Sequence, residues 1–113
     1  KQITEIRARK KENFVVLYLN ARNELIHKEF ISIGTLDASL VHPREVFAPA
    51  IEHRAVGVVL THNHPSGDVN PSDEDLELTK RIVESGKILG IEVFDHVIVT
   101  ETDYFSLKEN ELL

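Results

Sequence analysis

The chain contains no cysteine and no methionine, and it has no long apolar run. Without cysteine it can form neither a disulfide nor a metal site with thiolate ligands. No stretch approaches the roughly 18 apolar residues that cross a bilayer, and no secretory signal pattern opens the chain, so we expect a cytoplasmic protein. Because an initiator methionine is absent, we expect the charged N-terminal segment, residues 1–11, to link to a missing upstream domain.

Basic residues are fewer than acidic ones, with 13 Lys and Arg against 19 Asp and Glu, which gives a formal net charge of −6. This balance repels a phosphate backbone unless basic residues gather in one place. The one gathering is Arg7, Arg9, Lys10 and Lys11, and a solvated helix end or linker explains it better than a nucleic-acid contact. The 113 residues suffice for one compact domain, which we assign to residues 12–113.

Apolar patterning and turn residues divide the chain into alternating strands and helices. We expect strands over residues 14–19, 25–33, 55–60 and 91–99, a short helix from His42, a longer helix over residues 72–89, and a short strand followed by a helical tail over residues 104–113. Pro43 suits the first turn of the short helix, whereas Pro49 should bend or interrupt it within two turns. This alternation favours a sheet flanked by helices.

A cluster of polar residues follows the third expected strand. It reads H-x-H, seven residues, S, two residues, D, and comprises His62, His64, Ser72 and Asp75. Two imidazoles and one carboxylate, with a fourth position left for water, are what a hydrolytic zinc site requires. Residues two apart on an extended chain point to the same side, so both histidines can reach one ion if the chain stays extended past Leu60. The spacing therefore predicts a Zn²⁺ site.

Asp75 supports this interpretation because it falls on the apolar side of the expected helix, with Leu78, Ile82 and Leu89. A buried carboxylate is costly unless it is paired or binds a metal. The alternative is a capping box, in which Ser72 caps the helix and Asp75 returns the hydrogen bond. The cap explains neither histidine, and Ser72 can serve both purposes.

The residues of this cluster resemble the JAMM motif of the JAB/MPN+ metalloproteases. The segments 42–47 (HPREVF), 62–67 (HNHPSG), 71–72 (PS) and 95–96 (DH) narrow the resemblance to the bacterial RadC family, long labelled as DNA repair proteins. The resemblance extends from about Glu12 onward, with no departure at a ligand position. RadC proteins usually carry a helix-hairpin-helix-like region at the N-terminus, so this sequence resembles the catalytic-type domain alone.

The resemblance implies an α/β fold with a mixed central sheet flanked by helices, the cytidine-deaminase-like JAB/MPN fold. It implies that His62, His64 and Asp75 bind zinc, and that Ser72 donates a hydrogen bond to the developing oxyanion. A zinc-activated water would attack an amide carbonyl, while a glutamate takes the proton of the water and passes it to the leaving amine.

That glutamate should lie well upstream of the H-x-H pair, near the start of a strand. Glu12 meets this description best, since it precedes the expected strand over residues 14–19. Glu29 and Glu45 are the alternatives that the sequence leaves open.

The remaining histidines carry weaker signals. His42 is better explained by the start of a helix than by the cleft, and His27 and His53 by the surface. His96, beside Asp95, could orient a ligand of the metal, although a structural role is favoured for this pair.

Two functions compete. The first is a zinc metallopeptidase or isopeptidase that acts on an unidentified protein or peptide. The second is a non-catalytic DNA- or protein-binding module of the RadC family, which ranks lower because the chain is acidic and lacks interleaved basic and aromatic residues. A zinc nucleobase deaminase is excluded because its metal ligands include cysteine. The H-E-x-x-H, G-x-S-x-G and P-loop patterns are absent.

Overall fold

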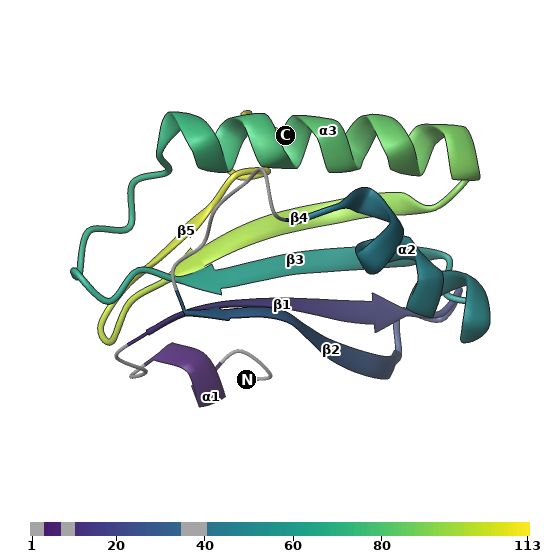
Figure 1. The fold of residues 1–113 in the computed structure, drawn as a ribbon, viewed down its shortest axis with the longest axis horizontal. Helices are drawn as coiled ribbons and strands as arrows, with labels where there is room; N and C mark the ends of the chain where they lie inside the picture. Colours follow the sequence, from purple (N-terminus) through teal and green to yellow (C-terminus); the bar gives the residue numbers. More distant parts are fainter. Residues whose placement is uncertain (1–3, 8–10, 35–40) are drawn as a thin grey trace.

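The computed structural model describes residues 4–7, 11–34 and 41–113. Its elements are α1 (Thr4–Arg7), β1 (Glu12–Leu19), β2 (Leu25–Gly34), α2 (Pro43–Glu52), β3 (Gly57–Asn63), α3 (Asp73–Leu89), β4 (Glu92–Val99) and β5 (Tyr104–Ser106). The described strands form one sheet in the order β2-β1-β3-β4-β5 (Figure 1). Only β3 and β4 are parallel, and the other neighbours are antiparallel. The expected α/β fold with a mixed sheet is confirmed.

The strand β1, which lies between β2 and β3, is buried on both faces, as its unbroken apolar run predicts. On one face Phe14, Val16 and Tyr18 join the main core cluster, to which α2 and α3 contribute apolar side chains. On the other face Val15 and Leu17 pack with residues that include Ile6 of α1. The sheet therefore has helical cover on both sides, and α1 lies on the face opposite α2 and α3.

The parallel pair β3 and β4 is joined by α3, since parallel neighbours need a crossover connection. The chain leaves the end of β3 and enters the first turn of α3 at the same edge of the sheet. Because β1 is antiparallel to β3, its start lies at this edge too, and Phe14 pairs with His62. This topology brings the beginnings of β1 and α3 to the end of β3.

The strand β3 continues through His62 to Asn63, past the predicted end at Leu60. The chain therefore stays extended through Asn63, which is the condition for placing His62 and His64 on the same side of it. The strand β1 likewise begins at Glu12, two residues earlier than expected.

The helix α3 buries Asp75, Leu78 and Ile82, as expected, but the prediction that Leu89 shares this stripe is wrong. Leu89 is 49% exposed. At Gly86 the carbonyl of Ile91 approaches so closely that a Cβ would lie 2.4 Å from it, and Ile91 takes the core position instead. The last turn of α3, which contains Leu89, lies beyond the close contact at Gly86 and is not covered by the core.

Two other features of local structure differ from the prediction. Pro49 does not interrupt α2, which runs to Glu52, because the buried side chains of Val46, Phe47 and Ala50 hold the helix against the core. The expected helical tail is also not formed.

After Ser106 the described chain makes turns, with hydrogen bonds such as that from the amide of Leu112 to the carbonyl of Leu107 at 2.8 Å. Leu107 is the only residue of this tail that is buried, and Leu112 and Leu113 are 47% and 41% exposed. A single buried side chain gives a helix no apolar face to pack.

The charged segment 1–11 is described only in part. Ile6 is 1% exposed and packs on the sheet, whereas Arg9 and Lys10 lie outside the described residues. The link to an upstream domain stays a prediction. No described helix is both long enough and apolar enough to span a membrane.

Candidate metal centre

Three side chains predicted to bind a metal converge at the edge of the sheet where β3 ends and α3 begins. The Nε2 atoms of His62 and His64 lie 2.9 Å apart. The two oxygens of Asp75 divide between them, with Oδ1 3.3 Å from Nε2 of His62 and Oδ2 3.2 Å from Nε2 of His64. His62 is fully buried and Asp75 is 4% exposed. The H-x-H spacing and the helical periodicity predicted that these three side chains would face one another, and the structure brings them together.

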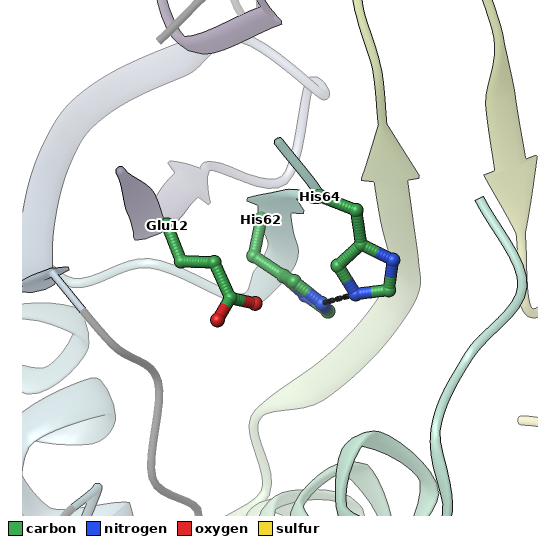
Figure 2. Close-up of side chains that lie close together, drawn as sticks. All are labelled: Glu12, His62 and His64. Atoms are coloured by element: carbon green, nitrogen blue, oxygen red, sulfur yellow. Dashed lines mark hydrogen bonds between the residues drawn. The ribbon is translucent and has the colours of Figure 1, made fainter. Parts of the chain in front are cut away.

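Glu12 stands on the open side of this group. Figure 2 shows its carboxylate and the two imidazoles pointing toward one another from β1 and from the end of β3. The ligand atoms of Glu12, His62 and His64 lie within 4.8 Å of one another. A cleft of about 330 Å³ opens beside them, and it is lined by Glu12, His64, Pro65, Ser66, Ser72, Glu74 and Asp75.

Two carboxylates thus compete for the same imidazole nitrogens, and burial distinguishes them. Asp75 is almost fully enclosed and contacts both rings, whereas Glu12 is half-buried at the cleft. The enclosed group is the better third protein ligand of a metal site, and the group at the cleft is the better acceptor for a proton from water.

The other glutamates considered from the sequence lie elsewhere. Glu29 on β2 contacts His27, with 2.7 Å between Oε1 and Nε2. Glu45 accepts a hydrogen bond from the amide of His42 and completes the cap of α2. Neither lines the cleft, so the geometry favours Glu12.

The lesser histidines mostly follow the sequence interpretation. His42 is exposed and caps α2, as expected. His53 is exposed, and His27 is partly buried, with its ring stacked on that of His53 at a centroid distance of 4.1 Å. The described residues bring neither of this pair to the cleft.

The capping box is present together with the cluster. The hydroxyl oxygen of Ser72 accepts the amide of Asp75 at 3.0 Å, and Oδ2 of Asp75 accepts the amide of Ser72 at 2.9 Å. The oxygen of the Ser72 hydroxyl serves as this acceptor, so its hydrogen is available to the cleft. The two interpretations of Asp75 are compatible, because the cap orients the carboxylate that faces the histidines.

The electrostatics of the cluster follow from these contacts. A hydrogen bond with Asp75 raises the pKa of His64, against the opposing effect of burial. Burial by itself would raise the pKa of the Asp75 carboxyl, but the hydrogen bonds from His62 and His64 hold that pKa far below its usual range. The carboxylate is therefore ionised, which suits a cation ligand.

The donor set fits a divalent metal such as zinc. Nδ1 of His64 donates to the carbonyl of Asp68 at 2.8 Å, so Nε2, which faces Asp75 and His62, is the nitrogen that can bind a cation once it is deprotonated. Imidazole nitrogens together with a carboxylate form a common zinc set. His62, His64 and Asp75 are the residues that would hold the ion, and their assignment as ligands stays a prediction.

Sequence reasoning missed Asn63, the residue between the two histidines. Its side chain points to the other face of the sheet, where Oδ1 accepts the amide of Asn13 at 2.6 Å and Nδ2 donates to the carbonyl of Lys11 at 2.9 Å. These two bonds hold the backbone on either side of Glu12. Period-two alternation could have placed Asn63 on that face, but its partners come from a distant strand.

The fold and the site together define an α/β domain with a candidate metal centre at the end of a central strand. Residues 2–112 match the profile of the RadC-like JAB domain, and the chain belongs to this family. It is 54% identical over 109 residues to a UPF0758 protein of Alkaliphilus metalliredigens strain QYMF, covering 96% of this chain and 47% of that protein. It is 53% identical over 105 residues to a UPF0758 protein of Bacillus cereus strain AH187, covering 93% and 47%. The chain thus spans about half the length of these relatives.

Proposed function

We propose that this domain is a zinc-dependent hydrolase that cleaves a peptide or isopeptide amide with a metal-activated water. The observation that carries the proposal is the meeting of Glu12 with His62 and His64 within 4.8 Å, at the side of the cluster that opens to the cleft. Membership of the RadC-like JAB family supports it, because the JAMM motif that the chain resembles belongs to metalloproteases of this class.

Each residue of the site has a separate role in the proposed reaction. His62, His64 and Asp75 would hold zinc, which when bound lowers the pKa of a coordinated water and polarises a carbonyl. The carboxylate of Glu12 accepts a proton from the attacking water and returns it to the leaving amine. The hydroxyl of Ser72 donates to the carbonyl oxygen as negative charge develops there.

The charge of the cleft bears on the substrate. Its described lining contains three carboxylates, those of Glu12, Glu74 and Asp75, and neither lysine nor arginine. Such a lining disfavours phosphate groups, so it argues against nucleic acid as the molecule bound there. A DNA-binding role for the family would have to use another surface, and a salt-sensitive DNA affinity that survives His64→Ala would reveal it.

The test combines metal analysis with cleavage. Purified protein is expected to hold about one zinc per chain, and to cleave members of a panel of fluorogenic peptides and lysine isopeptides. Glu12→Gln should keep the zinc and lose activity by about 100- to 10,000-fold, the usual contribution of general acid–base catalysis. Glu29→Gln and Glu45→Gln are matched controls that should retain activity. A protein that binds no zinc when supplied with it, or a Glu12→Gln variant as active as its parent, would refute the proposal.

A further inference from the structure

A buried line of side chains leads from His62 away from the cleft toward α3. Nδ1 of His62 lies 2.8 Å from Nε2 of His96, and Nδ1 of His96 contacts the hydroxyl of Thr79. That hydroxyl lies 2.8 Å from the carbonyl oxygen of Asp75. Both histidines are fully buried and Thr79 is 2% exposed, so the contacts form within the core.

The direction of these hydrogen bonds follows from counting hydrogens. A carbonyl oxygen can only accept, so the hydroxyl of Thr79 donates to Asp75, as threonine commonly does to the carbonyl four residues before it in a helix. The oxygen of Thr79 then accepts from Nδ1–H of His96. A neutral imidazole carries one hydrogen, so Nε2 of His96 is an acceptor.

The same count continues to the metal centre. Since Nε2 of His96 accepts, the hydrogen between the two rings belongs to Nδ1 of His62. In the neutral ring Nε2 of His62 therefore carries the lone pair that a metal ion would bind, and this nitrogen faces Nε2 of His64 and Oδ1 of Asp75. The opposite direction would place a hydrogen on Nε2 of His62, where a metal ion must bind.

The rings are also held in place by packing. The Phe14 ring lies against both, at centroid distances of 6.3 Å from His62 and 6.0 Å from His96, the latter edge to face. All three residues are fully buried, so the surrounding side chains restrict the rotation of the rings. A rotated His96 would break both of its hydrogen bonds at once.

From these contacts we propose that Thr79 and His96 are positioning residues that fix His62 in the tautomer required for metal binding. This inference rests on the proposed metal centre. The two histidine ligands then reach the same state by different routes, His64 through one bond to the carbonyl of Asp68 and His62 through three bonds that end at the carbonyl of Asp75. Asp75 thus acts twice, with its side chain at the metal and its main chain at the end of this line.

The tautomers can be read directly by long-range ¹H–¹⁵N NMR of the purified protein, without metal and with zinc. We expect the hydrogen on Nδ1 in both His62 and His96 in the two states. A hydrogen on Nε2 alone in His62, or on Nε2 in His96, would overturn the inference. This measurement needs no variant, so it decides the question even if a substitution prevents folding.

A matched pair of variants tests the consequence for the metal. Thr79→Val removes the hydroxyl at nearly constant volume, and it should weaken zinc binding by about 10- to 100-fold in a competition titration against a chelator. Thr79→Ser restores the hydroxyl and should bind zinc within about threefold of the parent. Thermal unfolding of the metal-free variants shows whether each variant folds. If Thr79 had a merely structural role, both the stability and the zinc affinity would also fall in the Thr79→Ser variant.

Equal zinc affinity in the parent and in a folded Thr79→Val variant would refute the role of Thr79. The outcome is separable from that of the proposed hydrolysis. A protein that binds zinc, shows the expected tautomers and cleaves no amide would remove the enzymatic proposal and leave this inference standing. Cleavage that persists in Thr79→Val at unchanged zinc affinity would do the reverse.

Discussion

Replacing Asn63 by alanine should destabilise the protein while leaving the proposed metal ligands in place. The change removes two hydrogen bonds that join the end of β3 to the backbone beside Glu12. Asn13, whose amide loses its acceptor, is 1% exposed, so water cannot replace the lost partner without opening the sheet. The carbonyl of Lys11 keeps its bond from the side chain of Asn13.

The size of the effect follows from this difference. A buried donor without a partner costs about 1–3 kcal/mol, and an ordinary hydrogen bond contributes about 0.5–1.5 kcal/mol. We therefore expect a loss of about 2–4 kcal/mol in the free energy of unfolding. For a domain of 113 residues, about 4 °C of Tm accompanies each kcal/mol, so the Tm should fall by roughly 8–16 °C.

Thermal and urea unfolding of the metal-free protein measure this loss, with Asn70→Ala as the control. Asn70 is exposed, and its loss should change the stability by less than about 0.5 kcal/mol. Because the side chains of His62 and His64 lie on the other face, zinc affinity should change little in Asn63→Ala. A stability equal to that of Asn70→Ala would show that the two bonds do not hold the start of β1, and the reasoning would be wrong.

Three further predictions concern the metal centre and the core. Zinc at about 100 times its Kd should stabilise the parent by about 2.7 kcal/mol, and this thermal shift should vanish in Asp75→Asn but persist in Glu12→Gln. In the metal-free protein the raised pKa of His64 stabilises the folded state. This contribution is complete below about pH 6.5 and is lost as the pH rises through the higher pKa that His64 has in the folded state. The lowered pKa of Asp75 contributes stability above about pH 4. The Tm difference between the parent and His64→Gln should accordingly shrink between pH 6 and pH 9, and a difference that grows over this range would contradict the assignment. Gly86→Ala should lower the Tm markedly, as monitored by circular dichroism, because its Cβ would meet the carbonyl oxygen of Ile91 at 2.4 Å and this backbone cannot move without displacing the start of β4.

The convergence of His62, His64 and Asp75 could be predicted from the sequence because each of these positions obeys a local rule. Two-residue alternation places His62 and His64 on one side of a strand, and helical periodicity turns Asp75 toward the core. Glu12 could be selected only through the family resemblance, because it reaches His62 by the pairing of β1 with β3, which no local pattern encodes. Glu29 and Glu45 stayed open for the same reason.

The errors also have identifiable physical causes. An interruption of α2 at Pro49 was considered because propensity was weighed without the packing of the helix. Leu89 was placed in the core because the periodicity of α3 continues beyond the part of the helix that the core covers. The contact of His96 with His62 was likewise not predicted, because it depends on the parallel pairing of β3 with β4. Patterns among neighbouring residues cannot predict the parallel pairing of two strands that a helix separates in the sequence.

The three consecutive residues 62–64 show what it would take to move this centre into another protein. The two histidines alone would transfer an affinity for metal, since any extended strand presents alternate side chains together. The asparagine between them serves the opposite surface, where it fastens the neighbouring strand that bears Glu12. A designer who grafts the histidines without that second strand should therefore obtain a metal-binding scaffold that lacks a correctly placed base.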